Sequence, residues 1–115
     1  MSITRISPGP RMSGAVVHGG TVYLAGHVSG DRSEGVRGQT RTILERVEQR
    51  LAEAGTDKSK ILSVQVWLAD IGTFEEMNEI YDQWVDPANP PARATVEARL
   101  ASPDYLVEIA VIAAV

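Results

Sequence analysis

Cysteine is absent from the 115 residues of this chain. Its absence excludes thiol nucleophiles, disulfide bonds and metal sites built on thiolates, and it fits a reducing compartment. An excess of basic residues is missing as well, because 11 Lys and Arg stand against 15 Asp and Glu, for a net charge of −4. The basic residues are scattered along the chain. Since nucleic-acid binding draws on a concentrated positive surface, we expect no nucleic-acid partner.

Long hydrophobic runs are also lacking. Residues 1–12 hold no apolar segment of the length that a signal peptide needs. The longest apolar stretch, at the C-terminus, is too short to span a bilayer and contains Glu108. We therefore expect a cytoplasmic protein without a membrane partner. Because a chain of this length supports one core, we predict a single domain over residues 1–115.

Signatures of metal or cofactor binding are missing too. No cluster of His, Asp and Glu has the spacing of metal ligands. The segment Gly26–Gly30 lacks both the lysine of a P-loop and the full dinucleotide-binding pattern. We expect neither a metal nor an organic cofactor.

The N-terminal quarter of the chain predicts strands and tight turns. Ile3–Ile6 is a candidate first strand. Two further β-prone runs, Ala15–His18 and Thr21–Ala25, flank the pair Gly19-Gly20. A two-residue glycine loop between such runs predicts a β-hairpin.

The middle of the chain predicts a helix, a strand and a second helix. Apolar residues recur on one helical face over Gln39–Ala54, and Ile61–Leu68 has the pattern of a strand. Thr73–Glu76 has the form of a capping box and opens a helix that runs to about Val85. Alternation along the strand places four side chains on one side: Leu62, Val64, Val66 and Leu68.

Two more strand-like runs end the chain. Ala92–Leu100 and Tyr105–Ile112 are separated by Ala101–Asp104, and we predict that they pair as a hairpin. Arg93 and Glu108 would then share one sheet face, about 13 Å apart at Cα from about 3.3 Å per residue. The whole order predicts an α+β fold in which two helices cover one face of a mostly antiparallel sheet. The other face is half apolar, which favours oligomerisation.

Arg93 and Glu108 are the first candidates for chemistry, because a charge within a strand is costly unless it is paired or used. The guanidinium fork of Arg93 suits a carboxylate ligand. Glu108 has apolar neighbours, and desolvation would raise its pKa toward the range useful for proton transfer. The alternatives are structural ion pairs, from Arg93 to Glu97, Glu108 or a C-terminal carboxylate, and from Glu108 to Arg99 or Arg93.

His27 and Asn78 are weaker candidates. His27 follows Gly26 at a strand end, a common place for a site residue. A lone histidine is nevertheless more often structural, and Asn78 on the second predicted helix is more often turned to solvent.

The segment Pro91–Leu100, with Val107–Ile109 beyond it, resembles the C-terminal signature of the RidA (YjgF) family. Leu24–His27, Val66–Asp70 and Phe74–Tyr81 are similar to other segments of that family, so the resemblance covers nearly the whole chain. It implies a chorismate-mutase-like α+β fold and a homotrimer with three clefts between subunits. It also implies hydrolysis of enamines and imines, such as 2-aminoacrylate and its imine, to 2-oxo acids and ammonia.

The resemblance also implies roles for individual residues. Arg93 would bind the carboxylate of the substrate. Glu108 would activate the attacking water and pass protons to the leaving nitrogen. Backbone groups of Gly26 and Thr95 would line the pocket, with Asn78 near its wall.

Several positions depart from the family pattern and leave the substrate open. Thr95 stands where the family has a pocket cysteine, His27 where it has glutamine, and Ala25 where it has serine. Met12 takes the place of a pocket tyrosine, and Ala110 that of a second glutamate. These differences place the chain nearer to a short YoaB-like branch, with Met12 and His27 as altered substrate-binding positions.

Two other functions compete with deamination. The first is a trimer that binds small carboxylates or acts as a chaperone without catalysis. The second is RNA cleavage with inhibition of translation, with which some relatives are described. The acidic charge and the absence of a basic patch argue against the second function.

Overall fold

The computed structural model describes all 115 residues, which form six strands, two α-helices and two short 3₁₀ turns. In chain order these are β1 (Thr4–Pro8), β2 (Ser13–His18), β3 (Thr21–Leu24), α1 (Val36–Glu53), η1 (Lys58–Lys60), β4 (Ile61–Leu68), η2 (Ile71–Thr73), α2 (Phe74–Trp84), β5 (Ala92–Glu97) and β6 (Val107–Ala114). The predicted α+β class is confirmed.

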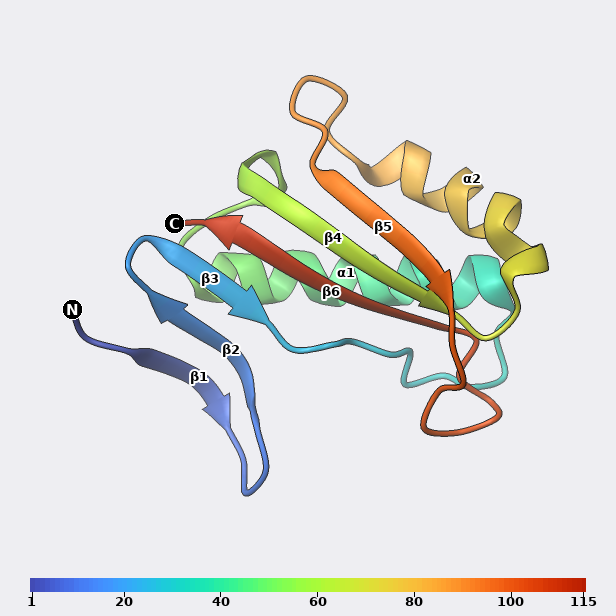
Figure 1. Cartoon of the computed structure of the whole chain (residues 1–115), viewed down its shortest axis with the longest axis horizontal. Coiled ribbons are helices and arrows are strands. Elements are labelled where there is room, and N and C mark those ends of the chain that lie inside the picture. The colour runs from blue at the N-terminus through green and yellow to red at the C-terminus, as the bar shows by residue number, and fades with distance from the viewer.

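All six strands belong to one mixed sheet in the order β1-β2-β3-β6-β4-β5. Neighbouring strands are antiparallel except for β4 and β5, which are parallel. Helix α1 crosses behind the middle of the sheet and α2 lies beyond β5, whereas β1 and β2 extend past the helices (Figure 1). The sheet therefore has a helix-covered face and an open face.

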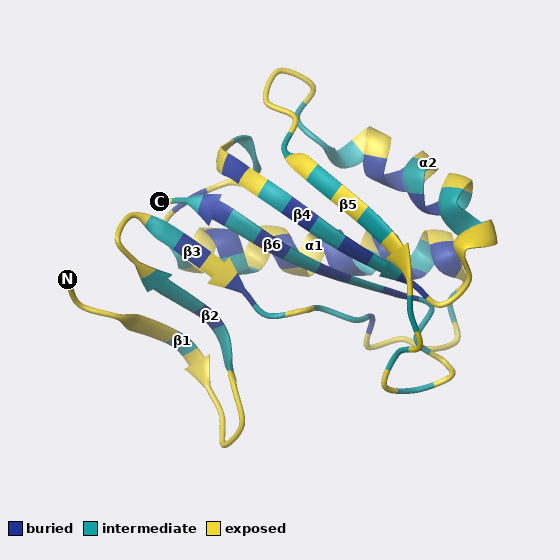
Figure 2. Ribbon diagram, in the orientation of Figure 1, coloured by how far each residue is buried: buried dark blue, intermediate teal, exposed yellow.

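The core lies between the sheet and the helices. Along β6, buried and half-exposed residues alternate (Figure 2). Val107, Ile109 and Val111 are fully buried toward the helices, and Glu108 lies on the open face between two of them. Strand β6 has a neighbour on both sides and so carries the centre of this core.

The hairpin at Gly19-Gly20 is confirmed. β2 and β3 pair with Val17 opposite Val22. Gly19 and Gly20 have φ of 60° and 80°, the left-handed values that a two-residue loop of this twist demands. Any other residue at both positions would be strained.

The prediction of a C-terminal hairpin is wrong. β5 does not pair with β6, because β4 lies between them. β4, α2 and β5 form a β-α-β unit, and the helix provides the crossover that a parallel pair requires. The turn predicted at Ala101–Asp104 is part of a longer loop from β5 to β6.

Two local predictions also need correction. Leu62 was predicted on the same side of β4 as Val64, but the register of β4 against β6 shifts between Ile61 and Ser63. Ile61 is therefore buried, and Leu62 is 52% exposed. The capping box of α2 does not form, because the hydroxyl of Thr73 donates to the carbonyl of Asp70. That bond belongs to turn η2, which precedes the helix and occupies the side chain that would have capped it.

Candidate functional site

Arg93 and Glu108 lie on opposite faces of the sheet. Arg93 pairs with Val64 of β4, which is buried under the helices. Glu108 pairs with Trp67 of β4, which lies on the open face. The prediction of a shared face is therefore wrong. The parallel pairing of β5 is the cause.

Neither residue makes an ion pair within the chain. The five salt bridges of the structure involve neither Arg93 nor Glu108. The ion pairs that the sequence left open as structural roles for Arg93 and Glu108 therefore do not form within the single chain.

Glu108 lies against a glycine at a break in the strand register. Tyr23 pairs with Ile112 but His27 pairs with Ile109, so four steps along the β3 side match three along β6. The extra residue is a β-bulge at the end of β3. A Cβ on Gly26 would lie 3.1 Å from Cδ of Glu108 and closer still to Oε2. A side chain at this position would displace the carboxyl from where it lies.

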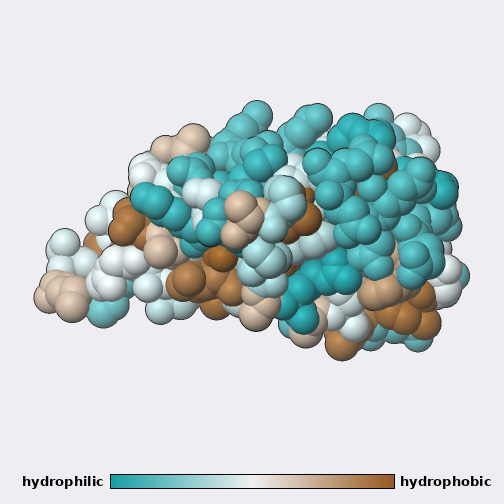
Figure 3. Space-filling model, turned by 90° about the horizontal axis from the view of Figure 1, so that it is seen from above, coloured by the Kyte–Doolittle hydropathy of each residue, from teal (hydrophilic) through white to brown (hydrophobic).

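The surroundings of Glu108 favour its protonated form. Burial raises the pKa of Glu108, and no neighbouring cation opposes that shift. Its cross-strand neighbour is Trp67, and Ala110 follows on the same face of β6. Viewed from above, apolar side chains gather along the lower margin of the molecule, the side of the open face (Figure 3). A raised pKa brings the carboxyl closer to the range in which a side chain can both accept and return a proton.

Arg93 lies at the edge of the sheet against helix α2. Its guanidinium carbon is 4.6 Å from the ring centre of Tyr81 and 5.7 Å from that of Phe74. The guanidinium donates no hydrogen bond within the chain, so its fork is held by aromatic rings and free to bind an acceptor. Phe74 and Tyr81 were not among the predicted site residues, although their spacing of seven along α2 puts both on the face toward β5.

Polar atoms near this edge lack partners. Thr95 pairs with the buried Val66 and so lies on the same side of β5 as Arg93. Its Oγ1 is buried without a hydrogen-bond partner, and so is Oδ1 of Asn78 on α2. Buried polar atoms without partners are rare in native proteins and mark places where a ligand or another chain completes the bonding.

His27 and Met12 lie apart from both charges. His27 pairs with the buried Ile109, so its ring is on the helix side, where Nδ1 donates to the carbonyl of Ala25 at 2.7 Å. Burial lowers the pKa of His27. Met12 is 65% exposed between β1 and β2. The structure thus brings Gly26 to Glu108, and Thr95 to the side of Arg93, but it does not bring the two groups together in one chain.

Other kinds of site find no support in the geometry. No group of three His, Cys, Asp or Glu side chains is placed to hold a metal ion. Neither helix combines the length and the apolar character that crossing a bilayer requires.

Comparison with known proteins agrees with the fold. The family model described as Endoribonuclease L-PSP matches residues 2–115. A RutC family protein of Haemophilus ducreyi is 43% identical over 98% of this chain and 97% of its own length. The RutC family protein YoaB of Escherichia coli is 38% identical over the full length of both chains. The crystal structure of a YjgF family member from Neisseria meningitidis superposes with a TM-score of 0.96 at 40% identity, covering 99% of this chain and 95% of the other.

Proposed function

The chain belongs to the YjgF and RutC family, and from this premise we propose that it hydrolyses reactive imines and enamines of 2-amino acids. The observation that carries the proposal is that Arg93 and Glu108 each lie in a strand and make no ion pair within the chain. The guanidinium of Arg93 is free to bind a carboxylate. The carboxyl of Glu108 has a raised pKa and lies against Gly26. Imine hydrolysis needs little more than these two groups, because the substrate is already activated.

In the proposed reaction Arg93 holds the carboxylate of a 2-imino acid through two parallel hydrogen bonds. Ionised Glu108 takes a proton from a water molecule as the water oxygen attacks the imine carbon. The protonated carboxyl then returns this proton to the nitrogen, which gives a carbinolamine. The carboxylate next takes the proton of the new hydroxyl group and passes it to the nitrogen as the carbon–nitrogen bond breaks, so that both protons of the water leave on ammonia and its oxygen stays on the 2-oxo acid. An enamine first takes a proton on carbon and loses one from nitrogen, which converts it to the imine.

A homotrimer is part of the proposal, because one chain holds Arg93 and Glu108 on opposite faces of its sheet. Two features support assembly. The open face carries Trp67, Ile112 and Val96, and Val96 is 45% exposed. Strand β5 also has an unpaired outer edge. In the proposed clefts, Arg93 of one copy faces Glu108 of its neighbour.

The remaining predicted positions divide between the two sides of such a cleft. Thr95 and Asn78 accompany Arg93, and their unpartnered oxygens are available to substrate or water. Gly26 accompanies Glu108, and Met12 extends from the adjoining β1–β2 connection. We leave His27 out of the substrate contacts, because its ring lies on the helix side.

An oxidase that converts an amino acid to its imine provides the test. Release of the 2-oxo acid is followed with and without the protein. We expect the protein to accelerate release, Arg93→Ala to abolish the acceleration, and Arg99→Ala, a matched arginine in the following loop, to retain it. No acceleration by the unaltered protein contradicts the proposal.

Carboxylate binding without catalysis is the second candidate, favoured by the free guanidinium of Arg93. Calorimetry with a 2-oxo acid separates the two functions. Binding that depends on Arg93, in a protein that does not accelerate imine hydrolysis, would select the non-enzymatic function. Cleavage of RNA stays the weaker alternative, and strongly salt-dependent RNA binding would revive it.

A further inference from the structure

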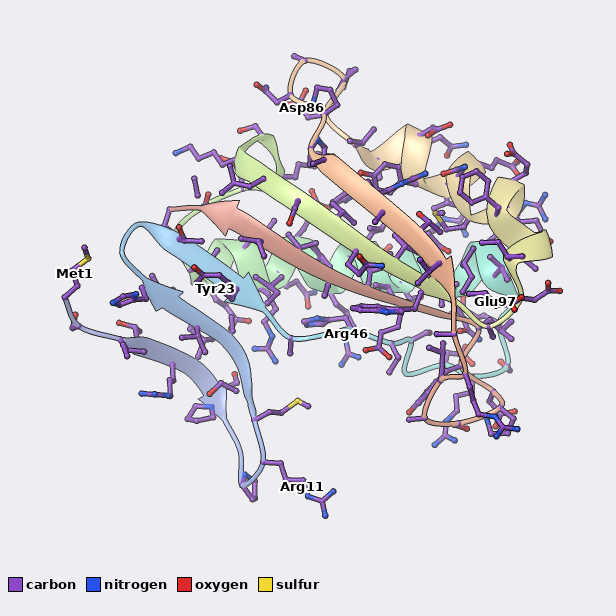
Figure 4. All side chains as sticks on the ribbon, viewed as in Figure 1. Met1, Arg11, Tyr23, Arg46, Asp86 and Glu97 are labelled. Carbon is purple, nitrogen blue, oxygen red and sulfur yellow. The ribbon has the colours of Figure 1, made fainter.

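A polar cavity of about 450 Å³ lies on the helix side of the sheet, behind Gly26. Its walls come from the β1–β2 connection, the segment after β3 and the second half of α1. Arg93 and Glu108 do not line it, so it is separate from both charges of the proposed reaction. Arg46 extends from α1 toward the segment after β3 (Figure 4).

Arg50 is held in this cavity by a close approach to Gly14 and by hydrogen bonds to two side chains. Its guanidinium lies against Gly14, where a Cβ would come within 2.6 Å of Cζ. Nη1 donates to Ser7 Oγ at 2.9 Å and to Glu53 at 3.0 Å. Ser7 is the one non-glycine residue with a positive φ, 50°. Strained backbone of this kind persists where the surrounding structure fixes it, and it gathers at ligand sites.

Arg46 adds a second cation to the same wall. It lies one helical turn before Arg50, so the two side chains share a face of α1. Arg46 Nη1 donates to the carbonyl of Val28 at 3.3 Å, and Nε and Nη2 of Arg50 have no partner. Only one carboxylate, that of Glu53, lines the cavity. Two guanidiniums against one carboxylate leave a positive excess with free donors.

His27 contributes an acceptor to the cavity. Because Nδ1 donates to the carbonyl of Ala25, the neutral ring offers Nε2 as an acceptor. The charged groups that face this ring are Arg46, Arg50 and Glu53, all on α1. Burial, and to a smaller extent the two arginines, lower the pKa of His27 and so favour the neutral ring. A ligand that bonds to all three side chains needs anionic oxygens to accept from Arg46 and Arg50. It also needs one hydroxyl group to donate to Nε2 of His27.

We propose that this cavity binds a small oxyanion that carries a hydroxyl group, such as a protonated phosphate or a 2-hydroxy carboxylate, between Arg46, Arg50 and His27. The segment Ala25–His27 forms part of the cavity wall. Gly26, in the same segment, lies against the carboxyl of Glu108.

Histidine NMR on the full chain tests the site, because His27 and His18 are its only histidines. His18 is exposed at the end of β2 and serves as the internal control. Inorganic phosphate is titrated at constant ionic strength, followed by lactate and by acetate, which lacks the hydroxyl. We expect a saturable shift of the His27 ring signals with His18 unmoved, and weaker binding of acetate. Tighter phosphate than lactate binding would identify a phosphate site, and the reverse a hydroxy-acid site.

Variants separate this site from the proposed reaction. Arg50→Gln and Arg46→Gln should each weaken phosphate binding about tenfold or more, whereas Arg41→Gln, elsewhere on α1, should leave it unchanged. Arg46→Gln removes only one bond to the fold, so it remains informative if Arg50→Gln loosens the β1–β2 connection. Arg93→Ala should retain phosphate binding even though it abolishes imine hydrolysis. Equal shifts of both histidines, or binding that survives Arg46→Gln unchanged, would overturn the proposal.

Discussion

The edge strand β5 carries Arg93 and the interior strand β6 carries Glu108, neither of them in an ion pair within the chain, and the two strands accommodate these charges in different ways. Arg93 on β5 lies over the rings of Tyr81 and Phe74 beside an open sheet edge. Glu108 on β6 has strands on both sides, and its carboxyl occupies the space that a side chain at Gly26 would take. At the edge of the sheet, Arg93 keeps its charge and its N–H donors stay free. On the interior strand, burial raises the pKa of the Glu108 carboxyl.

This difference assigns different work to the two residues. A guanidinium stays charged whatever its surroundings, so it can anchor a carboxylate without a shifted pKa. A carboxyl becomes useful for proton transfer when its surroundings raise its pKa, which burial does for Glu108. In the proposed reaction the edge therefore anchors the substrate and the interior strand moves the proton.

The largest expected effect is that of Glu108→Gln. The amide keeps the shape of the side chain on Gly26 but cannot take a proton from water. We expect kcat for imine hydrolysis to fall roughly 10²- to 10⁴-fold, the usual contribution of a general base, with KM nearly unchanged. Steady-state kinetics in the oxidase-coupled assay measures both. A variant that raised KM at constant kcat would make Glu108 an anchor and remove the contrast with Arg93.

Gly26→Ala tests whether the close approach of Gly26 positions the carboxyl of Glu108. The added methyl group overlaps the carboxyl and displaces it, and displacement of about 1 Å can lower kcat up to about 100-fold. Gly30→Ala is the matched control, because a Cβ there meets nothing within 4 Å. Equal activity of the two variants would show that the close approach of Gly26 and Glu108 has no part in the reaction.

Tyr81→Leu tests the aromatic support of Arg93. Loss of the ring should weaken carboxylate binding about 2- to 5-fold, since a cation–π contact made by a guanidinium that is still partly in water contributes about 0.5–1 kcal/mol. Titration calorimetry with a 2-oxo acid measures the change. Tyr105→Leu removes a similar contact with Arg32 in another part of the chain and should leave binding unaltered.

The smallest expected effect is on the pH dependence of stability. Because folding raises the pKa of Glu108, the folded chain holds that proton more tightly than the unfolded chain does. The resulting stabilisation is present at low pH and is lost as the pH rises through the ordinary glutamate range and then the raised pKa. Thermal unfolding from about pH 4 to about pH 8 should show this loss in the unaltered protein relative to Glu108→Gln. Parallel curves for the two proteins would contradict the raised pKa.

Much of the fold follows from local pattern. The Gly19-Gly20 hairpin, the helix over most of Val36–Glu53 and the alternation along β6 depend on neighbours in sequence, and all three were predictable. The pairing of β5 was not, because its alternation suits either β4 or β6 as a neighbour. The helix between β4 and β5 was the available signal, since parallel strands need such a crossover.

The candidate site was predictable in its residues but not in its geometry. Arg93 and Glu108 were identified because charges are unusual in strands. Their separation onto two faces follows from a pairing between distant segments that alternation cannot reveal. Likewise the bulge at Gly26 turns the ring of His27 to the helix side, and no local pattern marks that extra residue.

Activity of mixed oligomers tests most directly whether Arg93 and Glu108 act together across a subunit boundary. Arg93→Ala and Glu108→Gln are each inactive in the proposal, and they are co-expressed at equal levels so that the subunits mix. If each cleft takes its arginine from one copy and its glutamate from the next, random mixing restores about a quarter of the clefts. We predict that fraction of the unaltered activity in the coupled assay. Mixed oligomers as inactive as either parent would contradict a site shared between two copies.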